Sequence, residues 1–204
     1  MKLAALLETL PEVQTTGKLP DSIQALEYDS RRVAPDSLFI ALRGARVDGH
    51  KFAAQAAQRG AVAVVAEEPL DLPESCALLR VFDSRAAMAD LAAAFYGQPA
   101  RQLKLLGVTG TNGKTSVAFL LRHLLAAAGN RCGMIGTVEY DLGERVVPAS
   151  RTTPESLELQ AYLAAMRDAE CGMAVMEVSS HALQQHRVRG LDFSVGGFTN
   201  LTQD

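Results

Sequence analysis

The chain has 204 residues, enough for one large or two small domains, and its 48% hydrophobic and 21% charged residues are ordinary for a globular protein. A net charge of -3 excludes a general electrostatic attraction to nucleic acid or to anionic membranes, so we expect no nucleic-acid partner. The three cysteines are isolated in the sequence, which excludes a CxxC zinc site and favours a reducing, cytoplasmic setting over a disulfide framework.

The N-terminal segment is predicted to form a short amphipathic helix, because Leu3, Leu6, Leu7 and Leu10 fall on one helical face. Glu8 interrupts the apolar stretch, which argues against a signal peptide. No segment approaches the roughly 20 apolar residues that span a bilayer, so no membrane insertion is expected.

Residues up to about 88 alternate predicted strands and helices, a pattern typical of an α/β domain in which helices cover a sheet. These elements are strands at Ile23–Tyr28 and Ser37–Leu42, a helix at Phe52–Gln58, and strands at Ala61–Ala66 and Leu78–Phe82. Two turns, Asp29-Ser30-Arg31 and Gly44–Gly49, suggest an edge that binds a small molecule, although turns of this composition are usually only turns.

A predicted helix from about Ser84 to Tyr96, followed by a helix stop at Gly97–Ala100, places a domain boundary near residues 88–100. We divide the chain into a first domain, residues 1–88, and a central domain, residues 89–204. The elements predicted for the central domain are a strand at 103–106, a helix at Lys114–Ala128, a strand at Cys132–Val138, a loop or edge strand at Glu144–Pro148, a helix that opens at Thr153 or Pro154 and ends near Arg167, and strands at Gly172–Val178 and Phe193–Thr199. Because an α/β fold normally continues past its last strand into a loop and helix, we expect the central domain to be incomplete.

Residues Gly107–Ser116 read GVTGTNGKTS and join a predicted strand to a predicted helix. A glycine-rich turn with Lys-Thr at a helix start is typical of a nucleoside triphosphate site, in which backbone N–H groups and the helix dipole hold the phosphates. Five residues lie between Gly107 and Gly113, one more than in the common P-loop, so Gly110 is taken as the first glycine of the loop. Lys114 would reach the β- and γ-phosphates and Thr115 would bind Mg²⁺, which predicts that the chain binds ATP or GTP.

Polar residues also follow two later strands, at Glu177–His181 and at Thr199–Asp204. These strand ends lie at the sheet edge where ligands bind in open α/β folds. Glu177 is a candidate magnesium ligand, or an ordinary carboxylate in solvent. Ser179-Ser180-His181 has no GxSxG elbow, which argues against a hydrolase triad. Arg187 and Arg189, with Gln185, form a positive patch that suits an anionic substrate, although simple surface solvation would explain them equally well. Residues 151–153, Arg-Thr-Thr, form a plausible anion site or a helix cap.

Several of these segments resemble the Mur ligase family in both order and spacing. They are YDSRRVAPDSLFIALRGARVDGHKF, GVTGTNGKTS, RTTPES, VMEVSSHAL, QHRV and FTNLTQD, and they extend over almost the whole chain. The resemblance implies an ATP-dependent amide ligase of peptidoglycan precursor synthesis in the cytoplasm. It is strongest to the members that use an acyl phosphate to add the third amino acid to UDP-N-acetylmuramoyl-L-Ala-D-Glu.

The resemblance also implies roles for individual residues. The phosphates of ATP would be bound by Gly110, Thr111, Asn112, Gly113, Lys114, Thr115 and Ser116. Lys114 and Glu177 would be catalytic, and Thr115 and Glu177 would hold Mg²⁺. The uridine nucleotide would lie against Tyr28, Ser30, Ala45, Arg46 and Val47. The muramoyl-dipeptide would be held by Arg151, Thr152, Thr153, Ser179, Gln185 and Arg187, although some family members carry Asn where Arg151 stands.

The family pattern continues past Asp204 with a His-Leu-Asp run, a carbamylated lysine and a C-terminal domain, so this chain alone is expected to be inactive. Two other functions stay open at this point. One is another amide ligase of the superfamily, of the folylpolyglutamate or cyanophycin type, which would not need the uridine site of the first domain. The other is a non-catalytic nucleotide-binding switch, which would leave Glu177 and the anion-binding residues without a purpose.

Overall fold

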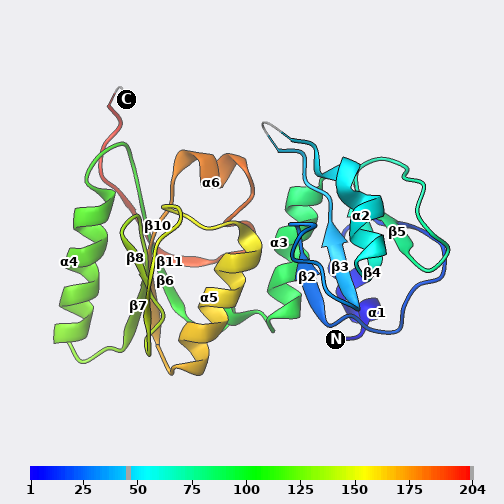
Figure 1. Ribbon diagram of the computed structural model, residues 1–204. Coiled ribbons are helices and arrows are strands. Elements are labelled where there is room, and N and C mark those ends of the chain that lie inside the picture. Colours follow the sequence, from blue (N-terminus) through cyan, green and yellow to red (C-terminus); the bar gives the residue numbers. More distant parts are fainter. Residues whose placement is uncertain (45–46, 203–204) are drawn as a thin grey trace. The chain divides into compact units, whose positions relative to one another are not determined.

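The computed structural model describes residues 1–44 and 47–202, and the chain divides into two compact units, Met1–Phe95 and Tyr96–Asp204. Each unit is built on its own sheet with helices packed against it (Figure 1), which confirms the predicted α/β class. The border between the units follows helix α3 (Ser84–Phe95), so the whole of this helix belongs to the first unit.

The first unit contains a five-stranded sheet in the order β1-β5-β4-β3-β2. Its strands are β1 (Gln14–Thr16), β2 (Ala25–Glu27), β3 (Ser37–Ile40), β4 (Ala61–Ala66) and β5 (Ala77–Arg80). All neighbours pair in parallel except β1, which is antiparallel to β5. The central strand β4 is apolar on both faces, as expected of a parallel strand that is covered on both sides.

The helices of the first unit are α1 (Leu3–Leu7), the short 3₁₀ helix η1 (Gly49–Phe52), α2 (Ala53–Gln58) and α3. Ala53 and Ala56 of α2 pack on the face of the sheet that carries Phe39 and Val64. Small alanines on α2 allow the helix to approach the sheet closely, and the large side chains of the strands fill the space between them.

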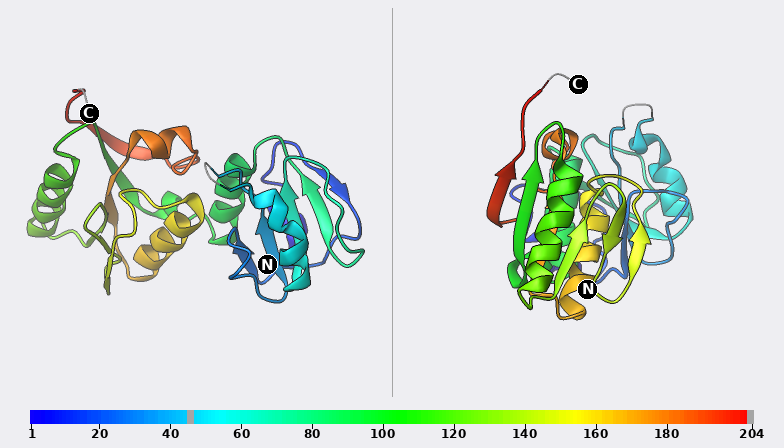
Figure 2. Two further views of the ribbon diagram at one scale, coloured as in Figure 1. Left: turned by 45° about the horizontal axis from the view of Figure 1, so that its top comes forward. Right: turned by 90° about the vertical axis from the view of Figure 1, so that its left-hand side faces the viewer.

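The second unit contains a six-stranded sheet in the order β11-β6-β10-β7-β8-β9. Its elements are η2 (Pro99–Gln102), β6 (Lys104–Thr109), α4 (Lys114–Ala127), β7 (Cys132–Ile135), β8 (Glu139–Asp141), β9 (Val146–Pro148), α5 (Ser156–Asp168), β10 (Met173–Glu177), α6 (Ser180–Gln184) and β11 (Phe193–Phe198). The four strands from β11 to β7 are parallel, and β8 and β9 extend the sheet in antiparallel fashion. Figure 2 shows β11, in red, as an edge strand.

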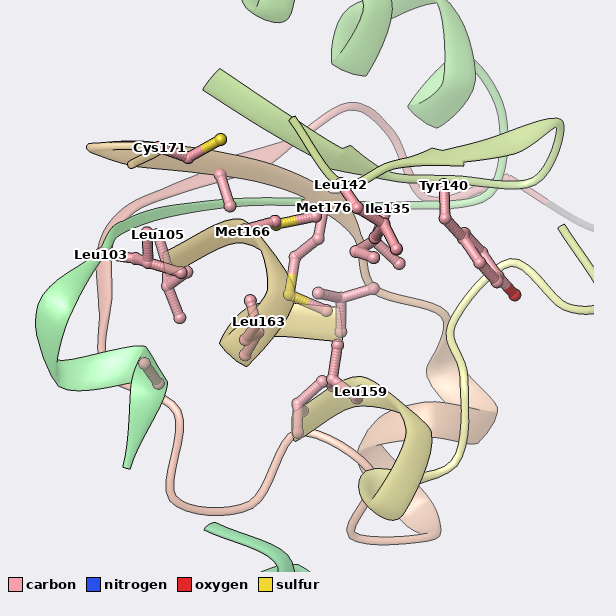
Figure 3. Packing of buried hydrophobic residues seen from close by; sticks show 14 residues of the cluster. Leu103, Leu105, Ile135, Tyr140, Leu142, Leu159, Leu163, Met166, Cys171 and Met176 are labelled. Carbon is pink, nitrogen blue, oxygen red and sulfur yellow. The ribbon is translucent and has the colours of Figure 1, made fainter. Parts of the chain in front are cut away.

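Helices α4 and α5 cover opposite faces of this second sheet (Figure 1). Ala118 of α4 packs against Val108 and Val175. On the other face, Leu163 and Met166 of α5 lie against the strands in a cluster of fully or nearly fully buried side chains (Figure 3). These two cores fix the strands whose ends carry the polar residues of interest.

Several elements differ from the sequence prediction, and α6 and β8 were not predicted at all. Strand β1 was not predicted because its Gln-Thr-Thr sequence is exposed and has no apolar signal. The predicted strand Cys132–Val138 ends at Ile135, and the chain turns back into β8. Helix α5 begins at Ser156, so the predicted opening at Thr153 or Pro154 is wrong.

None of the helices in the described part of the chain combines the length and the apolar character that crossing a lipid bilayer requires. All three cysteines are free and buried. Burial raises the pKa of the Cys76 and Cys132 thiols to about 11, and it also raises the pKa of Cys171.

We expect the native protein to resist thiol reagents, because the thiolate is the reactive form and these thiols stay protonated and buried at neutral pH. Titration with Ellman's reagent at pH 8 should give slow, substoichiometric labelling, and addition of denaturant should release all three thiols. Rapid labelling of the native chain would contradict the packing of the cores.

Candidate functional site

The loop between β6 and α4 is shaped by two glycines. Gly110 and Gly113 have φ angles of +127° and +84°, in the left-handed region that favours glycine. Gly113 is the N-cap of α4, so the loop delivers the chain directly to the start of a helix of 14 residues. The free N–H groups and positive dipole end of such a helix attract anions.

Lys114 folds back over this loop. Its Nζ donates hydrogen bonds to the carbonyl oxygens of Gly110 and Thr111, at 2.7 and 2.9 Å. The ammonium group is therefore held at the mouth of the loop, where it adds a full positive charge to the partial charge of the helix end. The start of α4 and the Lys114 ammonium thus place positive charge together at the end of this loop.

Glu177 lies at the carboxyl end of β10 and is only 1% exposed. Its carboxylate accepts hydrogen bonds from Thr115 Oγ1 at 2.9 Å, from the backbone N–H of Thr137 at 2.9 Å and from Thr137 Oγ1 at 3.2 Å. Strand β10 pairs in parallel with β6, with Glu177 opposite Val108. This register places the carboxylate beside the loop that follows β6. The alternative of a carboxylate in solvent is therefore wrong.

These oxygen atoms fit a divalent cation. Within residues 1–44 and 47–202, no lysine or arginine forms an ion pair with Glu177, so its buried negative charge faces hydroxyl and N–H groups alone. Carboxylate and hydroxyl oxygens are the ligands that Mg²⁺ prefers. Thr137 was missed by the sequence analysis; the only local signal is the preceding Gly136, where a Cβ would lie 2.7 Å from Glu177 Oε1.

Thr152 and Thr153 extend from this carboxylate toward α6. Thr152 Oγ1 lies 3.0 Å from Thr137 Oγ1. Thr153 Oγ1 donates to the carbonyl of Glu177 at 2.8 Å and accepts from the N–H of Ser179 at 3.1 Å. The cap interpretation of Thr153 is therefore wrong, because its hydroxyl ties the end of β10 to the next turn. Ser179 itself caps α6 by accepting from the N–H of Ala182.

Arg187 is held rigidly in the same region, with a side chain that is 11% exposed. Its guanidinium donates to the carbonyl of Thr153 at 2.8 Å and to Gln185 Oε1 at 2.7 Å, and it lies 3.1 Å from Glu155 Oε1. Surface solvation therefore does not explain this residue. Glu155, which sequence analysis missed, also pairs with Arg151, and its side chain does not cap α5.

The residues predicted to bind a uridine nucleotide belong to the first unit. Ser30 is buried, and its hydroxyl donates to Gln55 Oε1 at 3.1 Å. Tyr28 is half-buried just after β2, and Val47 is exposed. The predicted contacts at Ala45 and Arg46 lie outside the described residues. Beside Ser30, hydrogen bonds from Arg31 lower the pKa of Asp29 to about 2, so this carboxylate stays ionised at neutral pH.

Asp48, His50 and Glu68 place three potential metal-ligating atoms within 4.8 Å of one another. However, both ring nitrogens of His50 are engaged. Its Nδ1 lies 2.7 Å from Asp48 Oδ1, and its Nε2 accepts from the N–H of Glu67 at 3.0 Å. These bonds give His50 a structural role, because they connect η1 to the residue that follows β4.

Two family models match the chain. The Mur ligase middle domain matches residues 108–204, and the catalytic domain of the Mur ligase family matches residues 22–96. Among curated proteins, the UDP-N-acetylmuramoyl-L-alanyl-D-glutamate--2,6-diaminopimelate ligases of Geobacillus thermodenitrificans and Syntrophomonas wolfei are 53% and 46% identical over the whole chain. The chain spans 41% and 42% of the lengths of these relatives.

Solved structures agree with these matches. A structure of a ligase with the same name superposes on 98% of the chain and 41% of its own, with a TM-score of 0.80 and 28% identity. The MurF ligase from Thermotoga maritima, solved in complex with ADP, matches 77% of the chain and 32% of its own, with a TM-score of 0.52 and 25% identity. Both units of the molecule thus match parts of one kind of enzyme, and the chain belongs to the Mur ligase family.

Proposed function

We propose that this chain is the part of a ligase that binds ATP and the uridine-linked acceptor, and that the enzyme adds the third residue to UDP-N-acetylmuramoyl-L-Ala-D-Glu. The names of the similar curated proteins support this acceptor and favour 2,6-diaminopimelate as the added residue. The observation that carries the proposal is the buried carboxylate of Glu177, which joins Thr115 of the phosphate loop to the Thr137–Thr152 pair. Such an enzyme would work in the cytoplasm, where ATP and nucleotide-linked precursors are available.

The reaction would proceed in two steps, phosphorylation of the acceptor and amide formation. A carboxylate oxygen of the acceptor attacks the γ-phosphorus of ATP, the bond to the β-phosphate oxygen breaks, and ADP leaves. The amine of the incoming amino acid then attacks the acyl carbon, phosphate leaves with the bonding electrons, and the nitrogen loses a proton. Phosphorylation is needed because oxide is a poor leaving group and phosphate is a good one.

The residues of this chain would contribute mainly binding, orientation and charge neutralisation. The start of α4 and the Lys114 ammonium would hold the phosphates. Glu177 and Thr115 would hold Mg²⁺, which neutralises charge on the transferred phosphoryl group. Arg187 is held by three partners, so its guanidinium would meet the anionic acceptor in a fixed orientation, at little cost in conformational entropy.

Calorimetric titration of the chain with UDP-N-acetylmuramoyl-L-Ala-D-Glu, and separately with Mg-ATP, tests the proposal. Saturable binding of both ligands would support it. Binding of Mg-ATP alone would favour a folylpolyglutamate-type ligase or a nucleotide switch. Binding of neither would reject the proposed function for this chain.

Changing Ser30 to Ala should weaken binding of the uridine-linked acceptor by about tenfold, the typical value of one hydrogen bond, and leave Mg-ATP binding unchanged. The physical reason is that the Ser30 hydroxyl and its partner Gln55 form one polar pair in the first unit, whereas the phosphate loop lies in the second. Ser75→Ala, at an exposed position of the first unit, is the matched control. Equal loss of both ligands would indicate misfolding and contradict a local role.

A further inference from the structure

The segment that follows β11 lies along the phosphate loop. The N–H of Thr199 donates to the carbonyl of Thr109 at 3.0 Å, which continues the pairing of β11 with β6 by one residue. The carbonyl of Asn200 then accepts from the N–H of Thr111 at 2.9 Å. The FTNLT sequence thus runs beside the loop as an additional strand-like support, although no role followed for it from the sequence.

The side chain of Asn200 binds both backbone polar atoms of Asn112. Its Oδ1 accepts from the Asn112 N–H and its Nδ2 donates to the Asn112 carbonyl, each at 3.1 Å. Thr199 Oγ1 lies 2.7 Å from the same carbonyl, and Thr202 Oγ1 lies 3.2 Å from Asn112 Nδ2. A carboxamide is the side chain that can both donate and accept in this way.

The contact with this segment, like the turn itself, requires a residue without a side chain at Gly110. A Cβ at this position would lie 2.2 Å from Thr199 Oγ1 and 2.8 Å from the carbonyl oxygen of Asn200. Any side chain would therefore push the supporting segment away from the loop. On the loop itself, Lys114 donates to the Gly110 and Thr111 carbonyls. Lys114 therefore holds carbonyl groups of the turn, and Asn200 holds its N–H groups.

We propose that Asn200 is a positioning residue of the nucleotide site: it fixes the peptides of Thr111 and Asn112 before the nucleotide binds. This rests on the proposed function, since it assumes that the loop binds ATP. Because the N–H groups of Thr111 and Asn112 are engaged by Asn200, the phosphates are bound by the N–H groups from Gly113 onward and by Lys114. A loop fixed in advance loses little entropy on binding.

Two measurements on the 204-residue chain test the proposal, with Asn200→Ala as the variant. Amide hydrogen exchange followed by NMR should show that the Asn112 amide loses protection, while the Thr111 amide, which bonds to a backbone oxygen, keeps it. Calorimetry should show that the Kd for Mg-ATP rises by about tenfold, as expected for loss of one to two hydrogen bonds that order the loop. Binding of the uridine-linked acceptor should not change.

Asn130→Ala is the matched control, because Asn130 also bonds to a backbone carbonyl of this unit, that of Leu125, but lies at the opposite end of α4. It should leave both the Asn112 amide and the Kd unchanged. If the unaltered chain binds Mg-ATP and Asn200→Ala binds it equally well, the positioning role is overturned. If the unaltered chain does not bind Mg-ATP, the proposed function fails, and the positioning role fails with it.

Discussion

Replacing Lys114 by alanine should reduce the affinity of the chain for Mg-ATP by about 10- to 100-fold, the range expected for hydrogen bonds to a charged group. The Lys114 ammonium is the full positive charge held at the mouth of the phosphate loop, where it bonds to Gly110 and Thr111. Without it, the triphosphate would rely on the helix end and the magnesium ion alone. In the complete ligase implied by the proposed function, turnover should be lost.

Calorimetry with Mg-ATP measures this effect, and titration with the uridine-linked acceptor shows whether it is local. Lys104→Ala is the matched control, since Lys104 is exposed at the other end of the same strand, β6. It removes the same charge from the molecule but should change neither affinity. Unaltered Mg-ATP binding by Lys114→Ala would refute the assignment of the loop.

Replacing Glu177 by glutamine should change ATP binding in opposite directions with and without magnesium. The carboxylate supplies the negative charge that would hold Mg²⁺, so the gain in affinity on adding Mg²⁺ should shrink by about tenfold or more. In the presence of a chelator, the variant should bind metal-free ATP more tightly, because removal of a buried negative charge reduces repulsion of the polyphosphate. A change in ATP affinity that has opposite signs with and without Mg²⁺ distinguishes metal binding by Glu177 from a structural role.

The substitution should leave the fold intact. A glutamine oxygen can still accept from the N–H of Thr137, and the hydroxyls of Thr115 and Thr137 can rotate to accept from the new amide group. Glu144→Gln, at an exposed position, is the matched control and should behave as the unaltered chain. Parallel loss of ATP affinity with and without Mg²⁺ would instead assign Glu177 to packing.

The order of strands and helices could be predicted from the sequence because their signals are local. The apolar run at Ala61–Ala66 has the bounds of β4 itself, and the glycine-rich segment before Lys114 marks the start of α4. Where the signals were weak, prediction failed: β1 is polar and exposed, and Thr153 and Glu155, which precede α5, bind partners in distant parts of the chain.

Local sequence signals suffice for most of the element order, for the phosphate loop and for the residue types available for chemistry, since each depends on neighbours along the chain. The contacts of Glu177 with Thr115 and Thr137 depend instead on the folded sheet, because the registers of β10 with β6 and β7 bring three separate strand ends together. The support of the loop by Asn200 was decided in the same way, through the pairing of β11 with β6. Contacts between residues far apart in sequence depend on strand order and register, and these are fixed by the packing of the whole sheet between its helices.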